Sequence, residues 1–428
     1  MMLLISLYSV VDGIFLSHFA GKDAFSAVGF IMPYVMMFNS VGFMFGTGGS
    51  ALIAKRLGEK RHTHAQEIFT TLVFSSLIVG VCLAILGELF LKNAAYMQGA
   101  RGTLLENSML YARLYFIGTP ACLIQFEFEA LYQTSGKGPL GLKAAMISGL
   151  TNIVLDALFL GVFSLGIVGA SIATVISQYI GGCLPLLYYS RENNSTLRFV
   201  KGPFHGRELL KMCGNGSSEM VNNISMSVVC FFYNIQLIGY GGANGIAAFG
   251  IMNYVSFLFT AIFWGYISGI SPVISFHYGA CNHQELKSLF KKSVIMIASC
   301  CCVMFVLSEL LAGPIIAIYA GNENELMKIG IHGFRLFAFN FLFAGFSIFF
   351  SAFFTALNNG LISAILSFCR VFVFQIPAVF LLPRLWQLDG IWISVSVAEL
   401  MTVLLSLFFL VYTYKNNSEY VMSFYFLE

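Results

Sequence analysis

The sequence is poor in charge and has no long polar segment. Asp, Glu, Lys and Arg make up only 10% of its 428 residues, whereas a soluble domain has about 25%. This excludes an ordinary soluble domain, and we expect no nucleic-acid partner. The phosphate loop Gly-x-x-x-x-Gly-Lys-Ser/Thr is absent, and no loop is long enough for a catalytic domain. We therefore expect no enzyme activity, no catalytic residue and no cofactor.

Cysteines are present, but their spacing does not suggest chemistry. None of the ten forms a Cys-x-x-Cys pair, and most lie in apolar segments, including Cys300, Cys301 and Cys302. Small apolar filling explains them better than redox or metal chemistry. We also see no repeated ring or filter motif of a channel. The first apolar stretch begins directly at Met1, which leaves open a longer natural N-terminus.

Long apolar segments dominate what remains, since 58% of the residues are hydrophobic. About 20 apolar residues in a helix cross a bilayer. The short polar breaks predict an all-α integral membrane protein with twelve transmembrane helices, at residues 1–19, 24–54, 66–91, 104–134, 140–161, 167–189, 208–239, 244–277, 288–318, 326–357, 360–383 and 388–414.

The basic residues of the loops indicate how these spans are oriented. Fifteen lie on one side, at 55, 56, 60, 61, 137, 143, 191, 198, 201, 207, 211, 287, 291, 292 and 415, and five on the other, at 22, 92, 101, 328 and 384. Because cytoplasmic loops carry the excess of Lys and Arg, we expect both termini in the cytoplasm of a multi-pass protein of the inner, or plasma, membrane.

The two halves of the chain are related by an internal repeat. Without a gap, residues 23–69 align on 244–290 at an offset of 221, and nine pairs are identical: Ala27 and Ala248, Gly29 and Gly250, Phe38 and Phe259, Gly48 and Gly269, Ser50 and Ser271, Ile53 and Ile274, Gly58 and Gly279, His62 and His283, Phe69 and Phe290. An even number of helices per half predicts a pseudo-twofold axis along the membrane normal. We expect six-helix lobes at 1–190 and 208–414, a cytoplasmic linker at 191–207 and a short cytoplasmic tail at 415–428.

Ionisable side chains inside the spans are few. Each is a candidate for a functional role, because a charge at mid-membrane costs about 2.5–3.5 kcal/mol on insertion scales. Asp12, Asp156 and Thr174 all lie roughly 10 Å below the predicted outer ends of their helices, and Asn152 shares a helical face with Asp156. Two acids in a low dielectric cannot easily both ionise, which suits a proton carrier, while the same oxygen ligands suit Na⁺. The structural alternative is that both acids only bond neighbouring helices.

Other acids have weaker interpretations. Glu219, with Asn223 one turn later, either binds a cationic substrate or ion or is a packing acid bonded to nearby Ser and Asn side chains. Glu127 and Glu129 point to nearly opposite helix faces, so at most one faces a central cavity, and Glu127 is the candidate for substrate contact. Arg370 and Glu399 are predicted to form a structural ion pair. The equivalent loop residues His62 and His283 fit a loop role better than metal binding.

With these residues, the sequence resembles the multidrug and toxic compound extrusion (MATE) family of the MOP superfamily, in the bacterial branch typified by MepA and DinF. The resemblance covers nearly the whole chain. Its motifs are Val11-Asp12-Gly13-Ile14-Phe15, Gly48-Gly49-Ser50-Ala51 with Arg56-Leu57-Gly58, Asn152-Ile153-Val154-Leu155-Asp156 and Gly169-Ala170-Ser171-Ile172-Ala173-Thr174. Together they are specific, although each alone is weak.

The resemblance implies a function and a site. It implies a monomeric antiporter that exports amphipathic, often cationic molecules by alternating access as H⁺ or Na⁺ enters. The coupling-cation site falls on Asp12, Asn152, Asp156 and Thr174, with no other metal than Na⁺ at the two acids. Asn340 and Ala344 stand where some relatives carry an acid, which argues against a second-lobe cation site. The alternative is a flippase for lipid-linked oligosaccharides or other lipid precursors, which several deep Arg residues would favour.

Overall fold

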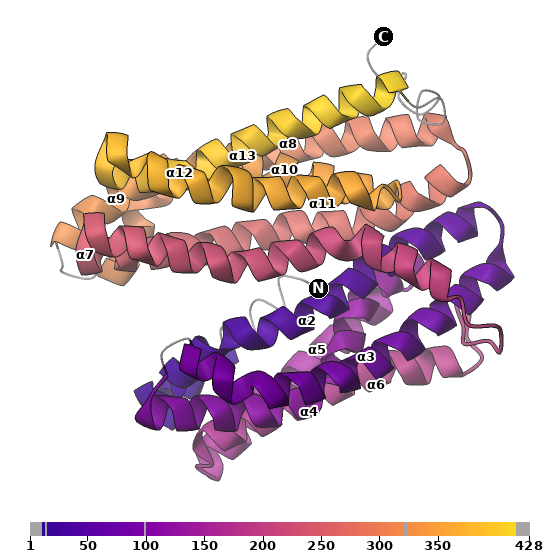
Figure 1. Ribbon diagram of the computed structural model, residues 1–428, viewed down its shortest axis with the longest axis horizontal. Coiled ribbons are helices and arrows are strands. Elements are labelled where there is room, and N and C mark those ends of the chain that lie inside the picture. The colour runs from indigo at the N-terminus through magenta and orange to yellow at the C-terminus, as the bar shows by residue number, and fades with distance from the viewer. Residues whose placement is uncertain (1–10, 13–14, 98–99, 321–323, 417–428) are drawn as a thin grey trace. The chain divides into compact units, whose positions relative to one another are not determined.

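Helices account for nearly all secondary structure in the computed structural model (Figure 1). It describes residues 11–12, 15–97, 100–320 and 324–416, and no strand occurs among them. The elements, with η marking π-helical segments, are η1 (Leu16–Ala20), α2 (Gly21–Gly58), α3 (His62–Met97), α4 (Gly102–Thr134), α5 (Gly138–Asp156), η2 (Ala157–Val162), α6 (Gly166–Ser190), α7 (Gly206–Gly279), α8 (His283–Ala320), α9 (Asn324–Ala338), α10 (Phe341–Ala356), α11 (Gly360–Phe368), η3 (Cys369–Gln375), α12 (Ile376–Leu381) and α13 (Pro383–Asn416).

The helices follow the predicted membrane segments closely. Eight are long and apolar enough to cross a bilayer, and the pair α9 and α10 makes up to nine. α4 and the first part of α7 coincide with two further predicted spans, 104–134 and 208–239. Most of the predicted first span, 1–19, and most of the tail, 415–428, lie outside the described residues. Each of the other eleven predicted spans therefore coincides with one or more of the described helices.

One predicted span contains a break that the sequence did not indicate. The span 326–357 is two helices, α9 and α10, bent by 44°, and the turn between them is tightened by bonds from the amides of Asn340 and Leu342 to carbonyls three residues earlier. α13 begins at Pro383, but non-helical backbone angles at Trp386 and Gln387 divide it directly before residue 388, where the sequence predicts the start of the last span.

The internal repeat is visible in the backbone as well as in the sequence. Left-handed residues recur at the same offset of 221 in three places, with φ of 85° at Gly21 and 57° at Gly242, 61° at Lys60 and 52° at Cys281, and 56° at Gly166 and 50° at Gln387. L-amino acids rarely adopt this conformation. Gly242 also divides α7 into the two helices that the sequence predicts, 208–239 and 244–277. Equivalent turns therefore connect equivalent helices in both halves.

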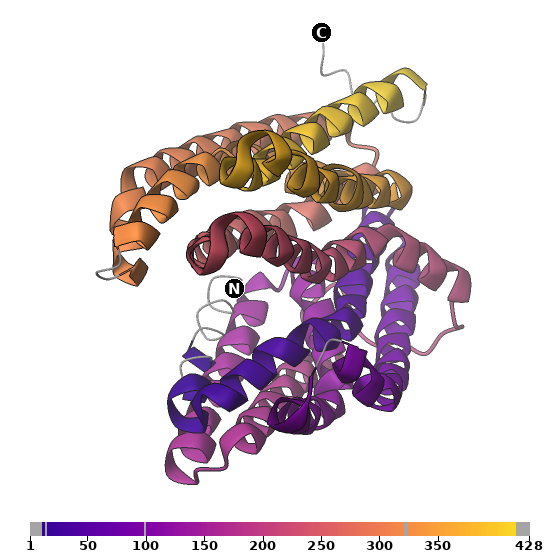
Figure 2. The same cartoon turned by 60° about the vertical axis from the view of Figure 1, so that its left-hand side comes forward.

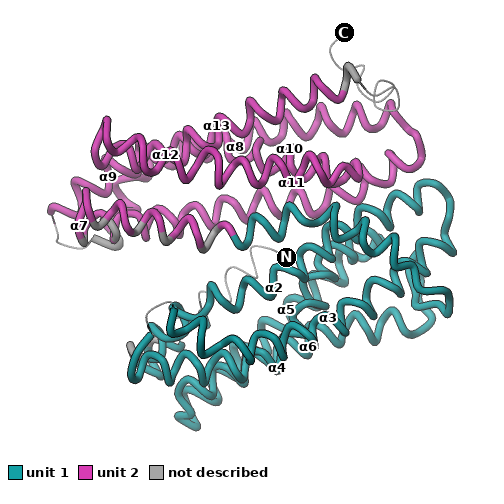
Figure 3. The backbone as a smooth tube through the Cα atoms, viewed as in Figure 1, with its two compact units in different colours: residues 1–224 teal, residues 225–428 magenta. Residues whose placement is uncertain are grey.

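The chain forms two compact units, residues 1–224 and 225–428 (Figure 3). In the first unit, α4 lies between α2 and α6 and also packs on α3 (Figure 2). The backbones of α2 and of the start of α7 are in direct contact where these helices cross. A Cβ added at Gly48 would collide with the Met212 carbonyl, and one added at Gly216 would collide with the Met44 carbonyl. Small residues permit this close approach between membrane helices.

The second unit has an apolar core rich in phenylalanine, and one ion pair lies within it. Phe334, Phe349 and Trp392 are almost completely buried there. Arg370, in η3, donates from Nε to a Glu399 oxygen on α13 at 2.9 Å. The ion pair predicted between these residues is thus present, and Glu399 is only 4% exposed.

Candidate functional site

The structure brings two carboxyl groups together inside the first unit. Asp12 lies one turn before η1, and Asp156 is the last residue of α5, directly before η2. The two carboxyl groups are close enough to interact electrostatically. Asp156 is fully buried, and no donor among the described residues reaches either of its oxygens. Two neighbouring carboxyl groups in a buried site repel each other when both are ionised, so a bound proton or cation stabilises them.

Each of these acids is followed by a π-helical segment. η1 packs against η2 and against α6. A π-helical segment interrupts the regular i to i−4 bonding, and such segments occur frequently at functional sites. The residues between Asp12 and η1 include 13 and 14 of the predicted motif, which lie outside the described residues. The packing of η1 on η2 nevertheless explains how residues 144 positions apart in the sequence meet.

Tyr111 completes the polar surroundings of the acid pair, and sequence reasoning missed it. Its phenol, on α4, faces Thr174 and lies in the electric field of both Asp12 and Asp156. Ser171 fixes this part of α4 against α6 by donating to the Tyr111 carbonyl at 3.0 Å. Asn152 is buried one turn before Asp156. The sequence contains one signal that could have identified Tyr111, because a second tyrosine, Tyr115, lies four residues later on the same helical face.

A line of buried polar groups continues inward from Tyr111. The rings of Tyr111 and Tyr115 are 5.9 Å apart. The Tyr115 hydroxyl accepts a hydrogen bond from the Asn39 amide at 3.1 Å and lies 3.8 Å from the Cys122 sulfur. α2 and α4 therefore share a line of buried polar groups that leads away from the acid pair.

Glu127 and Glu129 are both buried, and they face different neighbours as their spacing predicts. Glu127 lies against α2, where a Cβ at Gly46 would come 3.1 Å from its Cα, and the Ser76 hydroxyl of α3 faces its carboxyl. Neither Glu127 oxygen has a hydrogen-bond partner among the described residues. Glu129 instead borders a void of about 20 Å³ with Gln125 and Gly181.

Glu219 is also buried in the first unit, one turn after the Gly216 crossing. The Asn223 amide donates to the Glu219 backbone carbonyl at 2.8 Å, and Ser217 donates to that of Gly214. These side chains therefore satisfy the backbone of their own helix. The cluster is polar and buried, which fits either of its two predicted roles.

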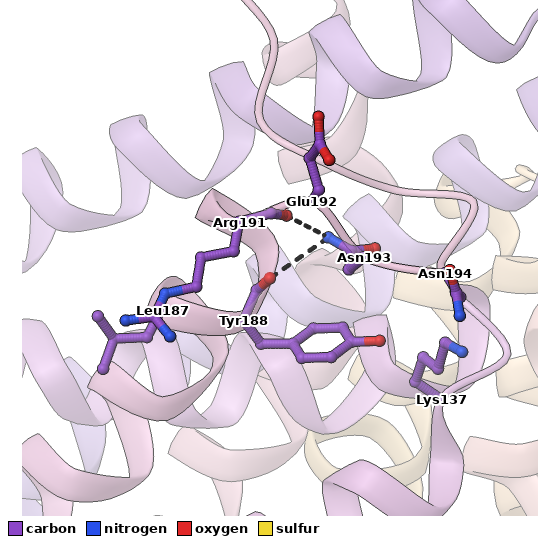
Figure 4. A pocket seen from close by; sticks show the side chains of 7 residues that line it. All are labelled: Lys137, Leu187, Tyr188, Arg191, Glu192, Asn193 and Asn194. Carbon is purple, nitrogen blue, oxygen red and sulfur yellow. Dashed lines mark hydrogen bonds between the residues drawn. The ribbon is translucent and has the colours of Figure 1, made fainter.

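A surface cavity has none of these acids in its lining. It has a volume of about 430 Å³ and is open at the surface near the end of α6. Figure 4 shows the Tyr188 ring pointing toward Lys137 and Asn194, and the Asn193 amide between the carbonyls of Tyr188 and Arg191. Its lining is polar and basic, so it is unrelated to the carboxyl pair.

An all-helical membrane fold with buried carboxyl groups is typical of a membrane transporter, and comparisons with known proteins identify the family. The sequence model of the MatE family matches residues 1–158 and 220–381. The chain therefore belongs to the MatE family. The predicted resemblance is confirmed, and the protein is a transporter, not an enzyme.

Similar proteins and solved structures agree with this family assignment. The chain is 26% identical to the multidrug export protein MepA of Staphylococcus haemolyticus, over 97% of this chain and 92% of that protein. It is 25% identical to the probable multidrug resistance protein YoeA of Bacillus subtilis, over 90% and 85%. A solved outward-facing MATE transporter of the MOP superfamily has a TM-score of 0.89 at 23% identity, over 96% of this chain and 92% of that one. The all-α, twelve-helix fold predicted from the sequence is thus confirmed, and the chain is a multi-pass membrane protein with small-molecule substrates.

Proposed function

We propose that this protein exports amphipathic, often cationic drugs or toxins across the inner membrane, and that protons entering on Asp12 and Asp156 drive the export. The export of drugs by the named relatives supports the substrate class. The proton is supported by one observation, the proximity of the two carboxyl groups in a buried site. Two acids this close repel each other when both are ionised, so a bound proton stabilises the pair, and a change of access can exchange this proton with the other side of the membrane.

Na⁺ is the alternative coupling ion. The Asp12 and Asp156 oxygens, with Asn152 and Thr174 nearby, are the hard oxygen ligands that such an ion prefers. Na⁺ would lie between the two carboxylates and screen their repulsion, whereas a proton on one carboxyl group joins it directly to the other. The proximity of the two acids favours the proton, because two bare carboxylates repel each other.

A lipid flippase remains less well supported. The deep arginine that could hold a lipid phosphate, Arg370, is already neutralised by Glu399. A buried ion pair of this kind has no free charge to offer to a head group. The described part of the chain therefore favours the exporter.

The rest of the machinery follows the sequence predictions. In our proposal, lobes 1–190 and 208–414, joined by the linker 191–207, alternate access in a monomer with both termini in the cytoplasm. Glu127, Glu219 and Asn223 contact the substrate. Glu127 is buried against α2 at Gly46, and Glu219 is buried three residues after Gly216, which contacts α2 at Gly48; this is consistent with a shared role.

Dye transport in everted vesicles tests this proposal. Vesicles would carry the wild type, Asp12→Asn, Asp156→Asn or the control Glu106→Gln, and a fluorescent cationic dye would be followed under a proton or a sodium gradient. We expect the wild type and Glu106→Gln, whose acid is exposed on α4, to move the dye under the proton gradient alone. Both aspartate variants should lose at least about 90% of this movement, because each variant lacks one of the two carboxyl groups that accept the proton.

The outcomes separate the alternatives. Dye movement that follows only the sodium gradient would replace the proton by Na⁺ at the same acids. Full transport by either aspartate variant would overturn the assignment of the pair, and dye movement independent of both gradients would reject the coupled exporter itself.

A further inference from the structure

Three potential metal ligands meet where the linker between the halves reaches α3. His64 and Glu67 are three residues apart in the first turns of α3 and therefore share one helical face. His205 is the last residue of the linker before α7. All three side chains are partly buried, with 29%, 21% and 21% of their areas exposed. They belong to the first unit and lie in a different part of it from the carboxyl pair.

The distances between their ligand atoms match a metal site. His205 Nε2 is 2.9 Å from Glu67 Oε2, His64 Nδ1 is 3.7 Å from the same oxygen, and all ligand atoms lie within 4.8 Å of one another. Ligands about 2.1 Å from a tetrahedral Zn²⁺ are roughly 3.4 Å apart. The observed separations bracket this value, so small side-chain rotations suffice to close the site.

Backbone contacts hold the third ligand in place independently of its side chain. The linker is bonded along α3 by Gln66 to the Thr196 carbonyl at 3.1 Å, by the Val200 amide to Thr70 at 3.1 Å and by the His205 amide to Thr71 at 3.4 Å. A linker fixed at these points delivers the His205 ring to Glu67. A ligand set that is preorganised in this way binds a metal with less loss of conformational freedom.

The cluster is specific to the first half of the chain. At the repeat offset of 221, His64 corresponds to Glu285 and Glu67 to Ser288, so the second half lacks the ligands. His62 and His283, in contrast, are kept in both halves and begin the equivalent helices α3 and α8. The common architecture of the two turns therefore does not explain His64 and Glu67, and His62 provides a nearby control.

We propose that His64 Nδ1, Glu67 Oε2 and His205 Nε2 bind a divalent transition metal ion such as Zn²⁺. Two imidazoles and one carboxylate are a common protein ligand set for zinc, with water in the fourth position. The carboxylate of Glu208, on the first turn of α7, lies in the field of His64 and adds negative charge nearby. The bound ion fastens the linker to α3 and stabilises the connection that leads into α7. This site extends the sequence prediction, which assigned no metal other than Na⁺ at the acid pair.

Metal titration of the purified full-length protein, without a histidine tag, tests the site. Co²⁺ serves as a visible probe, because its tetrahedral complexes absorb strongly, and Zn²⁺ should displace it. We expect one tight equivalent in the wild type, and a loss of affinity of about tenfold or more in each of His64→Ala, Glu67→Gln and His205→Ala. His62→Ala should bind like the wild type.

Trypsin cleavage provides a second measurement that does not depend on transport. The linker carries Arg191, Arg198 and Lys201, and Zn²⁺ should slow cleavage there several-fold in the wild type and in His62→Ala, but not in the three ligand variants. Wild type that shows no tetrahedral Co²⁺ spectrum and no protection would overturn the proposal and leave only a His205–Glu67 hydrogen bond. Equal binding by the wild type and all three ligand variants would place the metal elsewhere.

Discussion

The carboxyl groups of the first unit differ in their partners, and this difference indicates their roles. Asp156 lies next to Asp12, whereas only a serine hydroxyl faces Glu127. The carboxyl oxygens of both Asp156 and Glu127 have no hydrogen-bond partner among the described residues. A buried acid without a partner costs stability, and replacement of buried charged groups by apolar residues of similar volume often stabilises a protein by about 1–4 kcal/mol. A residue that is retained at such a cost is expected to serve function.

Glu127→Met therefore provides a test at the scale of one residue. We expect the variant to unfold at a higher temperature than the wild type, by several degrees, because it removes the desolvation cost. We also expect weaker dye export, because the substrate loses an acidic contact. Thermal unfolding in detergent and vesicle transport would be measured on the same preparations.

The control Glu106→Gln, at an exposed position on the same helix, should change neither the unfolding temperature nor dye export. A Glu127→Met protein that is more stable and exports dye normally would show that this acid is not used in transport.

At the scale of helices, the family motif around Gly48 has a structural explanation. Gly48 on α2 and Gly216 on α7 let the two helices cross with no side chain between their backbones. Arg56, eight residues later on α2, then pairs with Glu208 of α7 at 3.2 Å. One motif thus provides both the crossing and an ion pair that holds it. This crossing positions the first part of α7, with Glu219, within the first unit.

Alanine at either glycine should disrupt this crossing. We expect Gly48→Ala and Gly216→Ala to lower the unfolding temperature markedly or to reduce the yield of folded protein, since the added methyl group meets a backbone carbonyl that cannot move aside. Size-exclusion profiles and thermal melts in detergent would measure both effects.

Gly214 is the matched control, because it lies on the same helix with no atom within 4 Å of an added Cβ. Gly214→Ala should be neutral or slightly stabilising, as alanine favours the helix. Equal losses in all three variants would indicate a general sensitivity of this helix and not a specific crossing.

At the scale of the whole molecule, the charge bias of the loops predicts orientation. Fifteen basic loop residues share one side of the membrane and five the other. Because retention of basic loops in the cytoplasm sets topology, both chain ends should be cytoplasmic, and the loop around Arg101 should lie outside.

Reporter fusions check this orientation. A green fluorescent protein fused after Glu428 should fluoresce, and alkaline phosphatase at the same position should be inactive. Fusions after Arg101 should give the reverse result, since phosphatase folds only outside the cytoplasm. The same activities at both positions would contradict the predicted number of spans between them.

The sequence by itself determined the composition-driven features of this protein. Apolar length predicts the spans, because a bilayer requires about 20 apolar residues whatever the tertiary packing. The identical pairs at offset 221 predict the duplication, which the left-handed turns at Lys60 and Cys281 repeat. The cost of intramembrane charge selects Asp12, Asp156, Glu127 and Glu219 as candidates.

Only the tertiary structure decided which of these groups meet. The contact of Asp12 with Asp156 depends on the packing of η1 on η2, and the role of Tyr111 depends on how α4 lies beside α6. The bend between α9 and α10 and the meeting of His205 with His64 and Glu67 have the same origin. Local sequence sets the period and polarity of each helix, whereas contacts between distant segments depend on packing that no single segment encodes.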